Sequence, residues 1–433
     1  MPATPEIIGR GNTEGAELFS NWFSDLTQTA DNDGSAAYVF VMGSLVEILR
    51  SFDLPVVFPE INSLQTAVRH VAHEYLDEAE DYGYSPDICG YVKADVAVQL
   101  GGGKHPAGKI PRPSIAVLTN ACNTYIKWAE IWERLYDTQV FTLDVPGSRS
   151  ASSLATLGNG GLERDRRYVE AQIRELINTC EQLTGKQFDI DRLRDVLGYC
   201  NTVSASWKRI IELNQTRPAV FNALTDGTIY LGVANGLRGT PEAAGYFSDL
   251  VDEMELKVAE GVGTLDEETY RLSFVGVPCY PIFRRFNEMF SDWGGVFVNS
   301  TYLWFASGGG NLGFQYDLDR PIESLAEGVL LSTRDAMDSM FYNDRVVGSM
   351  IEDFGIDGVV YHPIKSCRTV STGLADGRRA LMEQHNVATL FIESDMMDRR
   401  VISEAQMKNR VDAFFEGLGT RRLRDKEAQA GGS

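Results

Sequence analysis

Three cysteines, Cys89, Cys122 and Cys367, lie in stretches rich in Gly, Asn, Thr, Ser, Pro and charge, namely DICGYVK, TNACNT and YHPIKSCRTVSTG. Such compositions are typical of loops. A cysteine that serves only for packing normally lies in an apolar run, so thiols in these stretches indicate chemistry. The first two are close in the sequence and the third lies far beyond them. The three thiols therefore predict a metal site wedged between two regions of the chain.

The absence of a CxxC pair argues against a structural zinc site, whose ligands usually come in close pairs. An iron-sulfur cluster suits widely separated thiolates, and a missing fourth cysteine leaves one iron with an exchangeable or oxygen ligand. Glu60, at the end of a predicted strand, is available as that oxygen ligand. A solvated carboxylate is an equally good interpretation of Glu60.

The other three cysteines favour structural roles. Cys180 and Cys200 fall inside helical patterns of apolar residues, where small buried side chains are expected. Cys279 follows a strand-like run and precedes a Tyr-Pro pair, and a structural role is also favoured there.

Composition limits the class of protein. The 433 residues carry 40 Lys and Arg against 61 Asp and Glu, a net charge of −21, which repels nucleic acid and anionic membranes. We find no long apolar run that would span a membrane and no secretory signal at the N-terminus. Six cysteines are too sparse for a disulfide scaffold, so a reducing compartment, the cytoplasm, is expected.

The pattern of elements predicts an α/β protein with two doubly wound parallel-sheet domains that face each other, and a helical segment between them. We place the N-terminal α/β domain at 1–165, the helical segment at 166–265 and the C-terminal α/β domain at 266–433. Strands are expected within 37–45, 54–62, 113–123, 137–147, 270–278, 294–305, 357–363 and 389–395, with helices over 63–83, 325–354 and 378–386.

Cys122 and Cys367 each follow a predicted strand by a few residues. Open parallel sheets bind ligands beyond the carboxyl ends of their strands. Two sheets that face each other with these ends would gather all three cysteines into one cleft.

Several motifs in the same order resemble the family of benzoyl-CoA reductase and 2-hydroxyacyl-CoA dehydratase iron-sulfur subunits. They are VMGSLVEILRSFDLPVVFPE, DICGYVK, TNACNT, DGVVYHPIKSC, FIESDMMDRR and the closing RVDAFFEGL. The resemblance implies that Cys89, Cys122 and Cys367 hold a 4Fe-4S cluster. It also implies a related second iron-sulfur subunit as partner.

Within that family the amino-acid sequence of these motifs is most similar to that of the larger catalytic subunit of ATP-dependent benzoyl-CoA reductases. The resemblance then implies a two-electron reduction of an aromatic acyl-CoA to a cyclohexadiene carboxyl-CoA. A 2-hydroxyacyl-CoA dehydratase subunit shares the same cysteines and stays open. A non-catalytic electron-relay subunit is a further alternative, and there Glu60 or another side chain would close the fourth iron position. The last alternative is an α/β binding protein that contains no metal.

Such reactions need electrons at very low potential, and this chain has no GxxxxGKS/T loop for ATP; the GGGKH at 101–105 lacks its spacing. The resemblance therefore implies ATP-hydrolysing subunits that inject electrons.

An acyl-CoA is polyanionic, so an acidic protein needs local cations. Candidates that lie close in sequence to the cysteines are Lys93, Lys104, Lys365 and Arg368, and a solvated surface role is the alternative for each. His105 and His362 are the candidate proton donors, with a neutral structural histidine as the alternative.

Overall fold

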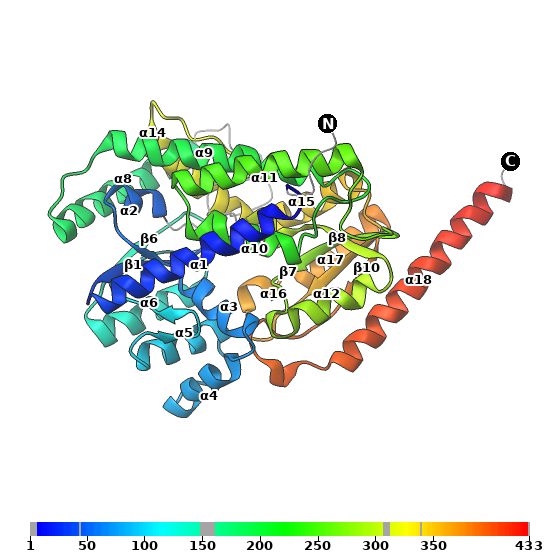
Figure 1. Ribbon diagram of the computed structural model, residues 1–433, viewed down its shortest axis with the longest axis horizontal. Helices are drawn as coiled ribbons and strands as arrows, with labels where there is room; N and C mark the ends of the chain where they lie inside the picture. Colours follow the sequence, from blue (N-terminus) through cyan, green and yellow to red (C-terminus); the bar gives the residue numbers. More distant parts are fainter. Residues whose placement is uncertain (1–6, 43–44, 148–160, 306–311, 338–339, 432–433) are drawn as a thin grey trace.

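Two parallel four-stranded sheets organise the chain, one from its first third and one from its last (Figure 1). The computed structural model describes residues 7–42, 45–147, 161–305, 312–337 and 340–431. The strand order is β2-β1-β5-β6 in the first sheet and β10-β9-β7-β8 in the second. Every neighbouring pair in both sheets is parallel. The predicted α/β class with two parallel sheets is confirmed.

The strands are short, and those in the middle of each sheet are mostly buried. The first sheet consists of β1 (Ser35–Val39), β2 (Val56–Val57), β5 (Arg112–Thr119) and β6 (Gln139–Leu143), and the second of β7 (Tyr270–Gly276), β8 (Gly295–Ser300), β9 (Gly358–His362) and β10 (Ala388–Phe391). In β7, β8 and β9 every residue is buried. Strands that are buried along their whole length are expected where helices cover both faces of a sheet.

Helices surround the sheets and fill the middle of the chain. In order they are α1 (Arg10–Asp31), α2 (Val46–Ser51), α3 (Pro59–Val68), α4 (Ala72–Tyr82), α5 (Gly90–Leu100), α6 (Asn123–Tyr136), α8 (Gly161–Thr184), α9 (Ile190–Leu213), α10 (Thr225–Gly236), α11 (Pro241–Glu260), α12 (Phe283–Ser291), α13 (Thr301–Phe305), α14 (Pro321–Val329), α15 (Met340–Asp353), α16 (Arg368–Ser371), α17 (Leu374–His385) and α18 (Glu404–Gly431). None of the helices in the described part of the chain is both long and apolar enough to cross a membrane.

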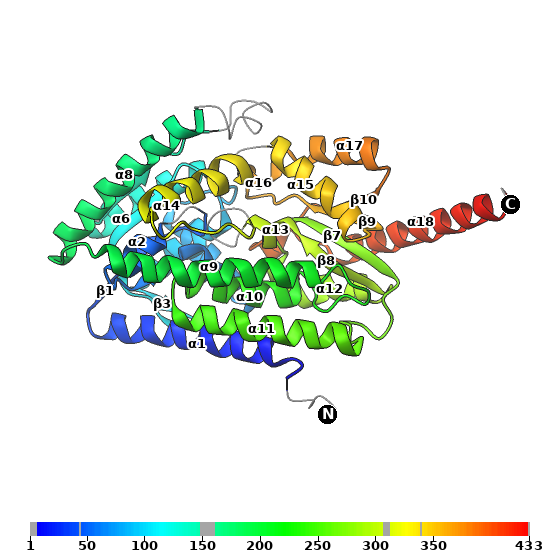
Figure 2. The ribbon, with the colours of Figure 1, turned by 90° about the horizontal axis from the view of Figure 1, so that it is seen from above.

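The predicted central helical segment corresponds to α8, α9, α10 and α11. The N-terminal helix α1 also packs on α10 and α11. Figure 2 shows α1, α10 and α11 together along the lower side of the molecule, whereas α8 lies apart from them. In both views α18 projects away from the rest of the molecule (Figures 1 and 2). The boundaries at 165 and 265 stay predictions.

Several predicted elements have different bounds. The helix expected over 63–83 is broken into α3 and α4, because His70 adopts a left-handed conformation with φ 62° between them. The strand expected over 54–62 ends at Val57, so Glu60 lies in the first turn of α3. The helix expected over 325–354 is interrupted by a π-helical stretch, Leu330–Met337; residues 338–339 lie outside the described residues.

The carboxyl ends of the strands of both sheets reach one cavity. Val41 follows β1, Cys122 follows β5, Gly276 ends β7 and Cys367 follows β9, and all four line it. The two sheets therefore position the cysteine segments against each other.

Candidate functional site

Each of the three cysteines occupies the N-cap position of a helix. Cys89 precedes α5, Cys122 precedes α6 and Cys367 precedes the short α16. The loop expected around Cys89 is therefore confined to the residues before it, because Gly90 already begins a helix. At a helix N-terminus the free backbone N–H groups and the helix dipole favour negative charge, and so favour a thiolate.

Contacts between their neighbours bring the cysteine segments together. The Gly90 N–H donates to Ser366 Oγ at 3.4 Å, which joins the residue after Cys89 to the residue before Cys367. Cys122 Sγ lies 3.3 Å from Thr369 Oγ1, in the first turn after Cys367. Residues from both halves of the chain thus hold the three thiols around one end of the cavity, which all three line.

The environment raises the pKa of two of these thiols. Burial, followed by the nearby Cys367, raises the pKa of Cys89 well above the usual range. Burial raises the pKa of Cys367 to about 11. Thiols of this kind stay protonated at neutral pH unless a positive charge such as a metal offsets the burial.

The donor set fits a cluster better than a single ion. Among the residues that the structure describes, no three His, Cys, Asp or Glu side chains come close enough to hold one metal ion. In an iron-sulfur cluster each thiolate binds a different iron, so the sulfurs stand further apart than around a single ion. All three cysteines are free thiols, as this role requires.

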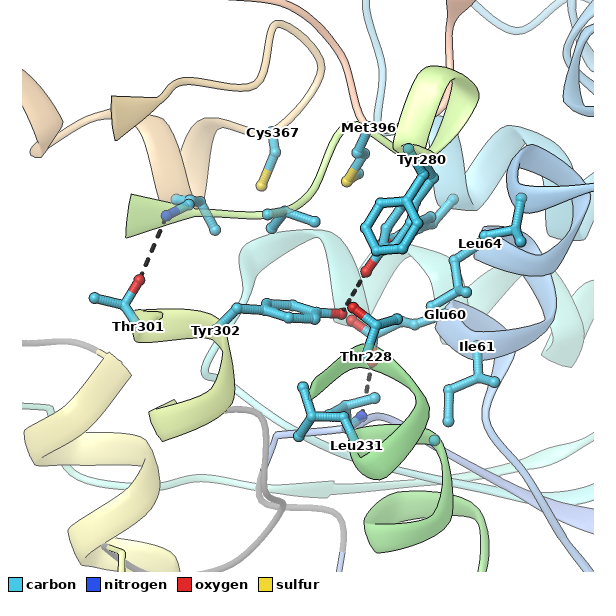
Figure 3. Close-up of a pocket in the computed structure, with 18 of the residues that line it drawn as sticks. Glu60, Ile61, Leu64, Thr228, Leu231, Tyr280, Thr301, Tyr302, Cys367 and Met396 are labelled. Carbon is cyan, nitrogen blue, oxygen red and sulfur yellow. Dashed lines mark hydrogen bonds between the residues drawn. The ribbon is translucent and has the colours of Figure 1, made fainter. Parts of the chain in front are cut away.

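The cavity next to the thiols has a volume of about 750 Å³ and a mainly apolar lining. Figure 3 shows Cys367 and Met396 on one side of it, with Ile61 and Leu64 of α3 and Leu231 of α10 across from them. A volume of this order is typical of pockets that bind small molecules and cofactors.

Glu60 lines this cavity from the first turn of α3. Its Oε2 accepts a hydrogen bond from the Val41 N–H at 2.7 Å, and its Oε1 accepts one from the Tyr125 hydroxyl at 2.8 Å. Burial raises the pKa of Glu60 to about 7, against the lowering effect of these two donors. The carboxyl can therefore carry a proton near neutral pH. The role of Glu60 as the fourth iron ligand stays a prediction.

Three tyrosines that sequence reasoning missed share this wall of the cavity: Tyr91 of α5, Tyr280 of the 3-10 helix η2 (Tyr280–Ile282) and Tyr302 of α13. The Tyr280 hydroxyl donates to the Tyr302 hydroxyl at 3.0 Å (Figure 3). The buried Tyr91 hydroxyl has no hydrogen-bond partner within the described ranges. Tyr91 lies in the DICGYVK motif of Cys89, whereas no local motif marks Tyr280 and Tyr302, and the three come from separate segments.

The predicted cations do not line the cavity. Lys93 is buried, and its Nζ donates to Glu80 Oε1 at 2.8 Å and to the Pro86 carbonyl at 2.9 Å. Lys104, Lys365 and Arg368 are exposed outside the cavity lining.

Two arginines that were not predicted, Arg69 and Arg284, do line the cavity and are exposed. Within the described part of the chain neither side chain has an ion-pair partner. In α12 it is the neighbouring Arg285 that forms an ion pair, with Glu288.

The two candidate histidines are buried outside the cavity lining. His105 Nε2 lies 2.9 Å from the Asn62 carbonyl, and its ring stacks on Phe23. His362 lies between the Val277 carbonyl, 2.6 Å from Nδ1, and Ser394 Oγ. Burial lowers the pKa of each histidine to about 4. These environments are typical of neutral structural histidines, so the proton-donor role of either stays a prediction without support from the geometry.

The remaining cysteines are buried, as expected for structural roles. Cys180 and Cys200 lie within α8 and α9, and Cys279 accepts a weak hydrogen bond from Ser394 Oγ at 3.5 Å.

Comparison with known proteins gives a consistent set of matches. A family model described as "2-hydroxyglutaryl-CoA dehydratase, D-component" matches residues 43–418. The chain is 30% identical over 430 residues to a benzoyl-CoA reductase subunit of Thauera aromatica, in an alignment that covers 96% of this chain and 97% of that protein. It is 27% identical to the (R)-phenyllactyl-CoA dehydratase alpha subunit of Clostridium sporogenes, over 88% of each chain. The (R)-2-hydroxyglutaryl-CoA dehydratase alpha subunit of Acidaminococcus fermentans is 24% identical, over 86% of this chain and 89% of that protein.

Proposed function

We propose, since this chain belongs to the 2-hydroxyglutaryl-CoA dehydratase D-component family, that it is the catalytic iron-sulfur subunit of an ATP-dependent benzoyl-CoA reductase. One observation carries this proposal: three free cysteines from both halves of the chain line one end of a cavity with an apolar wall. This arrangement can place a redox centre directly beside a bound acyl group.

Cys89, Cys122 and Cys367 would hold a 4Fe-4S cluster. When bound, such a cluster supplies single electrons at low potential. The chain contributes three helix N-termini that favour the negative charge of thiolates. Glu60 remains a proposal for the fourth iron, although its two oxygens already accept hydrogen bonds from Val41 and Tyr125.

The cavity suits an acyl-CoA thioester as substrate. Ile61, Leu64 and Leu231 offer an apolar wall to an acyl group or to the pantetheine chain. The exposed Arg69 and Arg284 would bind the phosphates of the CoA nucleotide, because their charges are not used by ion pairs within the described residues. In this proposal the two arginines take the role that we expected for Lys93, Lys104 and Lys365, which do not line the cavity.

The reduction of benzoyl-CoA adds two electrons and two protons to give a cyclohexadiene carboxyl-CoA. The electrons would come from ATP-hydrolysing partner subunits, and a related second iron-sulfur subunit would complete the enzyme. Glu60 can hold one of the protons at its carboxyl, because burial raises its pKa to about 7. We place the complex in the cytoplasm, since all six cysteines are free.

A dehydratase is the second candidate, favoured by the family match and by the relatives that are dehydratase alpha subunits. That reaction removes water from a 2-hydroxyacyl-CoA with no net change in electrons. The 30% identity to a reductase subunit over nearly the full length leads us to rank reduction first. The cavity beside the thiols argues against a subunit that only relays electrons, because such a subunit needs no substrate pocket.

The test is an anoxic purification of the chain co-expressed with its neighbouring subunits, with iron, sulfide and product measured on the same sample. We expect about four irons per cluster and cyclohexadiene carboxyl-CoA when benzoyl-CoA and ATP are added. Cys122→Ala should lose iron and activity, because alanine offers no ligand atom. Cys180→Ala is the matched control, since that thiol is buried in α8 outside the cavity.

Iron without ring reduction, combined with loss of water from a 2-hydroxyacyl-CoA, would select the dehydratase. Full iron in Cys122→Ala would refute the ligand assignment.

A further inference from the structure

The three cavity tyrosines have more hydrogen-bond donors than nearby acceptors use. Each phenol has one hydrogen to donate. The hydrogen of Tyr280 is used on Tyr302 at 3.0 Å. The hydroxyl of Tyr302 accepts that bond and, among the described residues, donates no hydrogen bond of its own. The hydroxyl of Tyr91, whose side chain is 7% exposed, has no partner there at all. Two donors are thus left over at one wall.

A buried hydroxyl without a partner destabilises the protein, so an acceptor that enters the cavity would be bound favourably. The two donors belong to one group of tyrosines. Tyr91 approaches Tyr280 and Tyr302 closely enough that its hydroxyl lowers the pKa of both as a hydrogen-bond donor would, although no contact of that hydroxyl has normal hydrogen-bond geometry. The three cysteines line the same cavity. The acceptor would therefore lie on the part of a ligand that is near the redox site.

The charges of the residues around the tyrosines indicate which kind of hydrogen-bond acceptor can bind there. Burial raises the pKa of Tyr302 to about 12 and also raises the pKa of Tyr280 well above its usual range, so both remain neutral donors. Glu60 lies close to these tyrosines, and its carboxyl in the ionised form would repel a fully charged anion such as a phosphate. The arginines that could offset such a charge are exposed at the solvent end. A neutral carbonyl oxygen in an otherwise apolar pocket fits this wall best.

We propose that Tyr91 and Tyr302 donate hydrogen bonds to the thioester carbonyl oxygen of the bound acyl-CoA, and that Tyr280 positions Tyr302. This inference rests on the proposed function and adds the residues that hold the reacting carbonyl. Addition of one electron to a conjugated thioester shifts negative charge onto that oxygen. Two fixed neutral donors stabilise this charge more than they stabilise the uncharged thioester, which lowers the barrier.

Tyr302 and Tyr91 therefore act as donors to the substrate, whereas Tyr280 acts through Tyr302. The hydrogen bond that Tyr302 accepts polarises its own O–H and makes it a better donor. Removal of the Tyr280 hydroxyl should weaken the interaction with the carbonyl without abolishing it.

The experiment is difference infrared spectroscopy on the anoxically purified holo complex with benzoyl-CoA labelled with ¹³C at the thioester carbonyl. Without ATP the substrate is bound and not turned over. In the wild type we expect the carbonyl stretch at lower wavenumber than in free benzoyl-CoA in an apolar solvent. Tyr91→Phe should move it back toward the free value. The Tyr280→Phe/Tyr302→Phe double variant should do the same, and it prevents Tyr280 from taking over the role of Tyr302.

Tyr280→Phe alone should give a smaller movement in the same direction. Tyr246→Phe is the matched control, because that buried phenol donates to the Gly11 carbonyl outside the cavity lining; its spectrum should equal that of the wild type. In the turnover assay, kcat/KM should fall about 100-fold or more for each lost donor.

The outcomes separate the two proposals. If the wild type binds benzoyl-CoA and the carbonyl frequency is the same in all variants, the tyrosine assignment is overturned while the proposed function stands. If the wild-type complex binds no acyl-CoA, the proposed function fails, and this inference fails with it.

Discussion

Buried titratable side chains in this chain have shifted pKa values for one shared reason, which is that burial disfavours the charged form. It raises the pKa of the Glu60 carboxyl to about 7 and lowers the pKa of His105 and His362 to about 4. The same effect thus allows the Glu60 carboxyl to hold a proton near neutral pH and leaves both histidines neutral there, so the proton-donor role of either histidine stays a prediction. Glu60 lines the cavity and the histidines do not, so the geometry agrees with this division.

The histidines lead to a prediction about pH. Between pH 6.5 and 4 the unfolded chain binds protons at His105 and His362 that the folded chain excludes, so stability falls as pH falls through this window. From pH 7 to pH 5 each histidine should cost about 2 kcal/mol of unfolding free energy. The urea midpoint of the wild type should therefore be lower at pH 5 than at pH 7.

His105→Gln should reduce this pH dependence by about half, because glutamine keeps a donor for the Asn62 carbonyl and does not titrate. The exposed His73→Gln serves as control and should leave the pH dependence unchanged. An equal loss of stability in all three proteins would show that other groups cause the acid sensitivity.

At the scale of elements, the beginning of α5 packs against the segment that follows β10. A Cβ placed on Gly90 would lie 2.6 Å from Met397 Cβ and 2.9 Å from its Cγ, which is closer than real contacts allow. Asp395 orders that segment, since it accepts hydrogen bonds from the N–H groups of Ser366 and Met397. The helix that Cys89 caps and the loop that carries Cys367 therefore meet through a glycine.

Gly90→Ala should push these elements apart, and we expect a loss of half or more of the bound iron together with a lower unfolding midpoint. Helix propensity predicts the opposite sign, because alanine in a helix is favoured over glycine by about 1 kcal/mol. Gly198→Ala in α9 is the control, since no heavy atom lies within 4 Å of its added Cβ. It should keep its iron and unfold at the same midpoint or a higher one. Normal iron content in Gly90→Ala would mean that the contact can relax without moving the cysteines.

At the scale of the whole molecule, the cavity lies between two halves that are joined by charge as well as by packing. Arg400 donates to Glu80 at 2.6 Å and to Asp77 at 3.2 Å, both in α4, and Glu80 also accepts from the buried Lys93. The lysine that we expected near the substrate thus belongs to the connection between the halves. The chain as a whole is strongly acidic, with a net charge of −21.

An acidic molecule that binds a polyanionic substrate depends on its local cations, so we expect Arg69 and Arg284 to matter through the CoA phosphates. The Arg69→Gln/Arg284→Gln double variant should raise the Kd for benzoyl-CoA about tenfold, since an exposed charge pair contributes at most about 1 kcal/mol. The effect should shrink at high salt. Benzoyl-pantetheine, which lacks the nucleotide phosphates, should bind both proteins equally in the same titration.

Arg285→Gln is the neighbouring control, because Arg285 pairs with Glu288 and does not line the cavity. A double variant with unchanged affinity for benzoyl-CoA would place the nucleotide elsewhere.

The sequence by itself determined which residues we propose for the redox chemistry and which class of fold presents them. Cys89, Cys122 and Cys367 stand out because their neighbours are polar, and the apolar runs at 115–118 and 358–361 indicate buried parallel strands. Both signals are local, since they depend on side-chain type and on the period of the chain. Glu60 could be proposed for the same reason, as a carboxylate at the end of an apolar run.

Only the tertiary structure decided what surrounds the cysteines. Tyr91, Tyr280 and Tyr302 come from three separate segments, and although Tyr91 lies next to Cys89, nothing local indicates that the three hydroxyls meet. Proximity in sequence does not decide such a contact: Lys93 follows Cys89 by one helical turn, yet its side chain forms an ion pair with Glu80, so its substrate contact stays a prediction without support from the geometry. Whether a polar side chain reaches a cavity, a partner or solvent depends on how distant segments pack, and that packing is set by the whole core.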